Sequence, residues 1–201
     1  MLEDKLEKIL KEKIIVFGCG RTDKGVHASQ YFFHIDVNNE PTFDLEFVLR
    51  QHLPSTISLF EIIKVKSQQH TRYHAQERKY DYFIHTKPDP FLERYSVLYQ
   101  EGVLDIDSMK SSAKLLQEYT DFRSFCIQPD AHNHTLCDIN NSNLFGNKDG
   151  TRLHFTISGN RFLKGMIRVL VATLLKIGRK EMTLSEFKDK LDNPLNGHNH
   201  K

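Results

Sequence analysis

The stretch Gly18-Cys-Gly-Arg-Thr-Asp-Lys-Gly-Val-His-Ala28 decides how the N-terminal part of the chain is interpreted. The apolar run at residues 14–17 before it predicts a short strand. The alternation of apolar and mixed side chains over residues 31–37 after it predicts a second strand, because side chains alternate between the two faces of a sheet. The glycines permit a tight connection, and charged side chains on such a loop are well placed to meet a ligand.

Two common glycine motifs do not fit this loop. A dinucleotide-binding fingerprint requires a third glycine where Asp23 stands, and a phosphate-binding Walker loop requires Lys and Ser or Thr where Val26 and His27 stand. An aspartate beside glycines most often caps a turn through its side chain. The loop residues alone therefore leave a structural and a ligand-binding role open.

The rest of the chain predicts alternating helices and strands. Apolar residues at Leu2, Leu6, Ile9 and Leu10 predict an amphipathic helix over 2–12, because they fall on one helical face. The remaining expected elements are a helix over 41–53 capped by Asp44, strands at 57–65 and 78–85, a helix opened by Asp105, a hairpin turn at 147–150, a long helix over 162–177 ended by Gly178, and a last helix opened by a capping box at Thr183 and Glu186. Residues 196–201 are expected to form a solvated tail.

This order predicts an α+β protein made of two small mixed or antiparallel sheets, each with helices packed on one face. Two prolines near residues 87–91 interrupt the pattern. We therefore expect an N-terminal domain over 1–95, which carries the glycine-rich loop, and a C-terminal domain over 96–201.

Composition sets broad limits on function. The chain has 201 residues and a formal net charge of +2, which neither requires nor excludes a nucleic-acid partner. Cys19, Cys126 and Cys137 are odd in number and form no C-x-x-C pair, so free thiols in a reducing compartment are expected. The sequence shows neither a long apolar run nor the apolar segment of a signal peptide, so we expect a cytoplasmic protein without a membrane anchor.

Four segments together resemble the tRNA pseudouridine synthase A family over roughly residues 2–190. The loop Gly20-Arg-Thr-Asp-Lys-Gly-Val-His-Ala28 is similar to the signature loop of that family. The other three are Gln69-His-Thr-Arg-Tyr-His-Ala75 with Arg78-Lys-Tyr-Asp-Tyr-Phe-Ile84, Asp121-Phe-Arg-Ser-Phe125, and Asn160-Arg-Phe-Leu-Lys-Gly-Met-Ile-Arg168.

The resemblance implies the pseudouridine synthase fold and an isomerase that converts uridine to pseudouridine at positions 38 to 40 of the tRNA anticodon arm. It implies Asp23 as the nucleophile, Tyr80 as the ring that stacks on the target base, and Arg168 as the cation that approaches Asp23. Arg21 is a candidate phosphate anchor. The reaction implied needs neither metal nor cofactor, and the implied partners are tRNA and a second copy in a homodimer.

Four further residues extend the expected RNA surface. Arg161, Lys164 and Arg168 would share one face of the predicted long helix, because they fall at i, i+3 and i+7. His70 and Arg72 directly precede the strand of Tyr80. Without the resemblance, a buried helix with a solvated basic edge would be the favoured interpretation of the first group, and ordinary surface charge remains an alternative for His70.

A metal site is a weak alternative. His132, His134 and Cys137 cluster in sequence, but structural zinc sites usually show four regularly paired ligands. Cys19 stands without a recognisable His and Asp arrangement, so a packing role is favoured over a nucleophilic one.

Compared with the family, the expected first strand and last strand are absent, and an arginine found in many relatives near Cys137 is missing. A catalytically impaired, truncated homologue that only binds structured RNA is therefore the second hypothesis. A third is an unrelated hydrolase with an aspartate nucleophile, which no acidic metal cluster in the sequence supports.

Overall fold

The computed structural model describes residues 1–194 and separates the chain into two compact units, Met1–Ala75 (unit 1) and Gln76–Lys201 (unit 2). The expected domain boundary at 95/96 lies twenty residues further along. The difference arises because β3 (Arg78–His85) pairs along its whole length with β6 (Arg152–Gly159), and this ladder holds β3 inside unit 2.

Unit 1 contains two helices and a very short sheet. Helix α1 (Leu2–Leu10) and helix α2 (Leu45–His52) confirm the two helices expected there. The Asp44 carboxylate caps α2 by accepting a 2.9 Å hydrogen bond from the amide of Phe47, as predicted. Strands β1 (Phe17–Gly18) and β2 (Phe33–His34) form an antiparallel pair of two residues each, far shorter than the strands expected at 14–17 and 31–37.

The strand expected at residues 57–65 is not formed. Its main chain is held instead by side chains of α2, since Arg50 donates to the carbonyl oxygens of Leu59 and Phe60 and the amide of Ile62 donates to the Glu46 carboxylate. Residues 14–16 are held in the same way by Glu3 and Glu7 of α1. The strand predicted from the apolar pattern at 57–65 is therefore wrong, because helix side chains take the place of a neighbouring strand.

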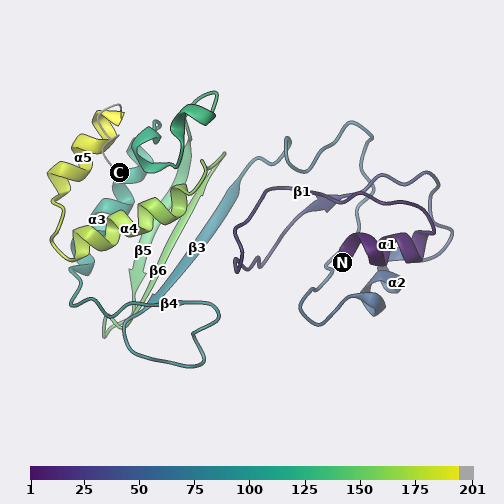
Figure 1. The fold of residues 1–201 in the computed structure, drawn as a ribbon, viewed down its shortest axis with the longest axis horizontal. Coiled ribbons are helices and arrows are strands. Elements are labelled where there is room, and N and C mark those ends of the chain that lie inside the picture. Colours follow the sequence, from purple (N-terminus) through teal and green to yellow (C-terminus); the bar gives the residue numbers. More distant parts are fainter. Residues whose placement is uncertain (195–201) are drawn as a thin grey trace. The chain divides into compact units, whose positions relative to one another are not determined.

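Unit 2 is a four-stranded sheet with the order β4-β3-β6-β5, where β4 is Val97–Leu98 and β5 is Ile139–Gly146. Helices α3 (Ile106–Leu115), α4 (Met166–Gly178) and α5 (Leu184–Asp192) gather on one side of this sheet (Figure 1). Three short 3-10 turns, Leu116–Glu118, Arg123–Phe125 and Pro129–Ala131, lie between α3 and β5. The hairpin turn at 147–150 and the capping box of Thr183 and Glu186 are confirmed.

The core of unit 2 lies between the sheet and the helices. This core contains residues of α3 and α4 together with alternate residues of β6, which are Leu153, Phe155 and Ile157. The α+β fold class with two small sheets is therefore confirmed. The expected tail at 196–201 lies outside the described residues.

Candidate active site

The glycine-rich loop of unit 1 connects β1 to β2 and returns on itself through a turn. The amide of Val26 donates to the carbonyl oxygen of Asp23 at 3.2 Å, and Gly25 adopts φ +83, a left-handed conformation that glycine accepts without strain. The side chains of Arg21 and Asp23 are both exposed on this loop. A carboxylate and a guanidinium therefore lie two residues apart on a short loop that is stabilised by the turn at Gly25.

Tyr31 fixes the entry to the loop. Its hydroxyl donates to the carbonyl oxygen of Gly20 and lies 3.4 Å from the Gly20 amide, while its ring covers Gly18 so closely that a Cβ at Gly18 would collide with it. A side chain at Gly18 would therefore displace the Tyr31 ring, whereas a Cβ at Gly20 would meet open space. Sequence reasoning predicted only a strand position for Tyr31, because a contact across the loop has no local signal.

The segment around His70 packs on the two short strands. The Thr71 hydroxyl donates to the carbonyl oxygen of Phe17 at 2.9 Å and lies 3.0 Å from Nδ1 of His34. The His70 ring meets His34 edge-on with centroids 4.6 Å apart, and contacts Tyr73 at 4.5 Å. Residues 69–75, which the resemblance singled out, therefore support the sheet that carries the Asp23 loop.

His70 stabilises the local turn, in addition to its expected place on the RNA-binding surface. Its Nδ1 accepts a 3.1 Å hydrogen bond from the amide of Arg72, which closes the turn and leaves the Arg72 side chain exposed. The ordinary-surface alternative for His70 does not describe its surroundings, because the ring is half-buried among other aromatic rings.

Tyr80 lies on β3 of unit 2, on the same face as the helices. Its ring is half-buried and meets Phe162 edge-on, with centroids 5.1 Å apart and planes at 87°. Edge-to-face contact is a favoured aromatic geometry, and here it holds the tyrosine ring against the segment that precedes α4. Arg78 joins the same two segments by donating to the Asn160 carbonyl oxygen at 2.9 Å.

The long helix begins later than predicted. Gly165 adopts φ +69 as the N-cap of α4, so Arg161 and Lys164 precede the helix and only Arg168 lies on it. The prediction that these three cations share one helical face is therefore wrong. Residue Ile127 packs directly over Gly165, and its amide donates to the Lys164 carbonyl oxygen at 2.8 Å, which replaces a further helical turn.

Partners from the loop before β5 hold the two cations ahead of the helix. Lys164 Nζ donates to the side-chain oxygen of Gln128 at 2.7 Å, and Arg161 Nη1 lies 2.9 Å from Nε2 of His134. Gln128 has φ +55, an uncommon conformation for a residue other than glycine. Sequence reasoning missed both partners, because they lie 36 and 27 residues away along the chain.

The predicted site residues therefore form two groups. Asp23, Arg21, His70 and Arg72 belong to unit 1, whereas Tyr80, Arg161, Lys164 and Arg168 belong to unit 2. Asp23 and Arg168 lie in different units, so the expected pairing of their charges stays a prediction.

The residues considered for metal binding do not assemble. No group of three His, Cys, Asp or Glu side chains within residues 1–194 is arranged to hold a metal ion. All three cysteines are free thiols, and burial raises the pKa of Cys137 to about 11. Among those same residues, no helix has the length and apolar character needed to cross a membrane.

Comparison with known proteins gives one consistent result. A family model described as tRNA pseudouridine synthase matches residues 113–200. A tRNA pseudouridine synthase A from Parabacteroides distasonis is 34% identical over 198 residues, covering 95% of this chain and 75% of the relative. Those from Bacteroides fragilis (35% over 186 residues, 91% and 73%) and Brevibacillus brevis (33% over 194 residues, 94% and 77%) match similarly. Because the three relatives match nearly the whole chain, it belongs to the tRNA pseudouridine synthase A family.

Proposed function

We propose that this protein converts uridine to pseudouridine in the anticodon stem-loop of tRNA, at positions 38 to 40, with Asp23 as nucleophile. The observation that supports it best is the exposed Asp23 carboxylate on a turn-braced loop, in a chain whose relatives are named tRNA pseudouridine synthase A. The reaction is an isomerisation, so it consumes no second substrate.

In this proposal the loop geometry serves the chemistry directly. The Asp23 carboxylate acts as nucleophile while the bond between C1′ of the ribose and N1 of the uracil breaks. The carboxylate thereby bonds to C1′. The uracil turns, C5 attacks C1′ and displaces the Asp23 carboxylate, and C5 then loses its proton while N1 gains one. The braces from Tyr31 and from the turn at Gly25 keep the carboxylate in place during these steps, which lowers the entropy cost of reaching the reactive geometry.

Unit 2 would supply the base pocket and the counter-charge. Tyr80, held edge-on by Phe162, offers a ring on which the detached uracil can stack. Arg168, exposed in the first turn of α4, would approach the Asp23 carboxylate and favour its ionised form. Bringing the target base to this carboxylate requires flipping it from its stack, at a cost of a few kcal/mol.

The remaining cations would bind phosphates rather than take part in the reaction. Arg21 lies beside Asp23 on the loop, and Arg72 is exposed next to the His70 cluster. Arg161 and Lys164 are held before α4 by His134 and Gln128. Because phosphate contacts position RNA without reading its sequence, loss of one of them should weaken binding more than it slows the reaction.

We infer as well that the protein acts as a cytoplasmic homodimer, without metal or cofactor. Sedimentation velocity with and without tRNA would test the dimer. An unchanged rate in EDTA is expected, and loss of activity in EDTA that added metal restores would contradict the metal-free mechanism.

One observation favours a second candidate, an RNA-binding homologue that has lost catalysis. Unit 1, which carries Asp23, buries only Leu6, Ile14 and Leu49 as its core. A unit with so small a core has few contacts with which to hold a reactive geometry.

The test uses unmodified tRNA transcripts, purified protein and no added metal. Asp23→Ala should give no pseudouridine while binding the transcript nearly as well as the wild type. The matched control is Asp36→Ala, which removes another exposed carboxylate from unit 1 and should retain activity. Mapping the product along the transcript checks positions 38 to 40.

The outcomes separate the candidates. Wild-type product that disappears only in Asp23→Ala supports the enzyme. Binding without product in the wild type favours the second candidate. Loss of both product and binding in Asp23→Ala would show that Asp23 is structural, and the nucleophile assignment would fail.

A further inference from the structure

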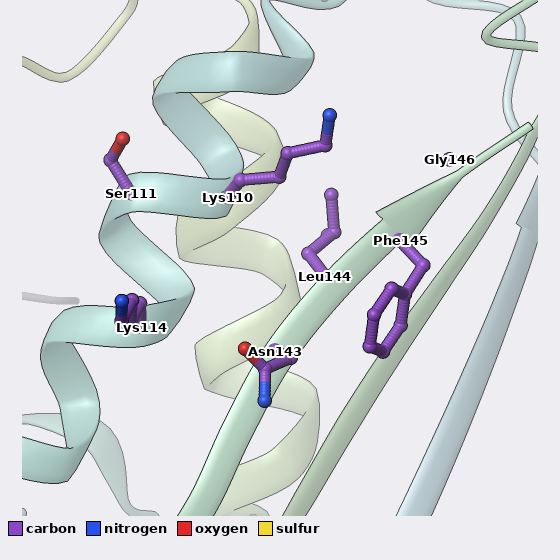
Figure 2. Close-up of a pocket in the computed structure, with 7 residues that line it drawn as sticks. All are labelled: Lys110, Ser111, Lys114, Asn143, Leu144, Phe145 and Gly146. Atoms are coloured by element: carbon purple, nitrogen blue, oxygen red, sulfur yellow. The ribbon is translucent and has the colours of Figure 1, made fainter. Parts of the chain in front are cut away.

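An open groove of about 440 Å³ lies between α3 and the outer edge of β5 in unit 2. Figure 2 shows its two walls, with Lys110 reaching from α3 toward the strand and Leu144 pointing back at the helix, while Phe145 projects from the opposite face of β5. Within unit 2, the groove is distinct from the residues proposed for the active site, Tyr80, Arg161, Lys164 and Arg168. From Ile139, which lies beside the Asn160 segment, to Gly146 the strand advances about 24 Å at its usual rise per residue.

The strand edge in this groove offers main-chain groups that have no partner among residues 1–194. The amide of Asn147 donates to the carbonyl oxygen of Arg152, and the amide of Arg152 donates to the side-chain oxygen of Asn147, so Asn147 and Arg152 form a hydrogen-bonded pair of the hairpin. Because such pairs alternate along an antiparallel ladder, the N–H and C=O groups of Leu144 and Gly146 point away from β6. The Ser142 carbonyl follows the same alternation, and the Gln117 side chain binds it from outside at 3.1 Å.

The charge on the rim of the groove is positive. Lys110 and Lys114 lie one helical turn apart, and none of the seven residues that line the groove, all within the described chain, is acidic. Lys110 makes one exposed ion pair, 3.2 Å from Asp107. Such exposed pairs contribute at most about 1 kcal/mol, so Lys110 can exchange this partner for another carboxylate at little cost.

The two faces of the sheet differ at β5, since one carries the lysines of α3 and the other carries Phe145. This difference determines which side chains a strand bound at the edge should have on each face. A strand added to this edge would present one set of alternate side chains to the lysines on the helix side. The other set would lie on the open face beside Phe145, whose side chain is 54% exposed. Acidic and apolar side chains in alternation therefore match the groove, because successive side chains of a strand point to opposite faces.

We propose that the β5 edge is a docking site for an extended peptide segment of a partner protein in which acidic and apolar residues alternate. The segment pairs with the main chain of Leu144 and Gly146, its carboxylates meet Lys110 and Lys114, and its apolar side chains cover Phe145. This is strand addition at a sheet edge, in which main-chain hydrogen bonds supply affinity and side chains supply specificity.

The experiment measures fluorescence anisotropy of a labelled heptapeptide of alternating Glu and Val with the full chain. Saturable binding is expected, weakened about tenfold in Lys110→Gln/Lys114→Gln because both rim charges are lost. Lys66→Gln/Lys188→Gln removes the same charge elsewhere and should bind as the wild type does. A peptide methylated at alternate main-chain nitrogens cannot pair with the strand and should not bind.

Four outcomes would overturn the proposal. One is no binding of the heptapeptide, and another is equal binding of the methylated peptide, which would indicate charge contact alone. Equal binding of a Lys and Val peptide would remove the role of the lysines. Displacement of the peptide by tRNA, unaffected by Asp23→Ala, would identify the groove as an RNA surface instead.

Discussion

The two units of this chain hold their extended segments in different ways. In unit 2, β6 pairs with β3 on one side and with β5 on the other, and the described part of the unit buries twenty-one residues in one core. In unit 1, carboxylates and a guanidinium of α1 and α2 bind the main chain of the extended segments, and three residues form the core. The comparison teaches that the unit carrying the proposed nucleophile is organised by polar contacts around a small core, whereas its neighbour is organised by packing.

Apolar exposure follows the same division. Phe60, Ile62, Ile63 and Val65 of unit 1 all have exposed side chains, although their sequence is that of a strand. Little apolar area is therefore removed from water in this unit, and burial is the main favourable term in folding. We expect the main-chain amides of unit 1 to exchange with solvent faster than those of the unit 2 sheet.

The largest loss of stability is expected from Phe122→Ala in unit 2. Phe122 is fully buried, and truncating such a phenylalanine typically costs about 3–5 kcal/mol. Urea unfolding followed by circular dichroism would measure this loss. A loss of unfolding free energy below about 1 kcal/mol would show that unit 2 does not depend on a packed core. That result would contradict the contrast between a unit organised by packing and one organised by polar contacts.

A comparable truncation in unit 1, Leu49→Ala, should have a more local effect. Leu49 is 1% exposed and is one of only three core residues, so its loss should cost about 2–5 kcal/mol locally and unfold unit 1 while unit 2 persists. Hydrogen exchange resolved along the sequence would show protection lost before residue 76 and retained after it. Simultaneous loss in both units would mean that the two units unfold together.

Gly165→Ala tests whether the turn before α4 positions the cations of unit 2 that are proposed to bind tRNA. The residue has φ +69, and an added Cβ would collide with Ile127. The left-handed conformation alone costs about 1–2 kcal/mol for a residue with a side chain. We expect weaker tRNA binding, because Arg161 and Lys164 precede this turn, and Gly20→Ala is the control for stability because its Cβ meets open space. Unchanged stability and unchanged tRNA binding in Gly165→Ala would show that this turn positions neither Arg161 nor Lys164.

The helix caps offer a matched pair across the two units. Asp44 accepts from the Phe47 amide in unit 1, and Asp105 accepts from the Ser108 amide in unit 2. Replacing either with Ala should cost about 1 kcal/mol, a typical value for a lost N-cap. If unit 1 depends on polar contacts as proposed, Asp44→Ala should shift its hydrogen exchange further than Asp105→Ala shifts that of unit 2. Equal shifts would contradict this.

Acid should weaken unit 2 through a few hydrogen-bonded carboxylates. Hydrogen bonds from the side chains of Asn140 and Ser158 lower the pKa of Glu77, and those from Ser108 lower the pKa of Asp105. A lowered folded-state pKa stabilises the fold above the ordinary carboxyl value of about 4, and this contribution is lost as the pH falls through the folded-state value. The urea midpoint should therefore drop below about pH 4, and less steeply in Glu77→Gln. An identical pH profile in that variant would exclude Glu77 as a contributor.

The sequence predicted the elements whose signals are local. The caps at Asp44 and Asp105, the capping box at Thr183 and the strand Arg78–His85 are all present, because each depends on side chains within a few residues. The start of α4 was misplaced, since Ile127 and Gly165 meet only in the folded chain. The expected strand at 57–65 failed because a strand requires a partner, and its sequence does not show whether one is available.

By itself the sequence determined the family, through the loop from Gly20 to Ala28, and with it the proposed reaction and the proposed nucleophile. Only the tertiary structure decided what positions those residues, because Tyr31 over Gly18, Phe162 against Tyr80 and Gln128 on Lys164 are contacts between distant parts of the chain. Composition and spacing report local propensity and chemistry. Which side chains meet depends on packing and hydrogen bonding, which the folded chain alone establishes.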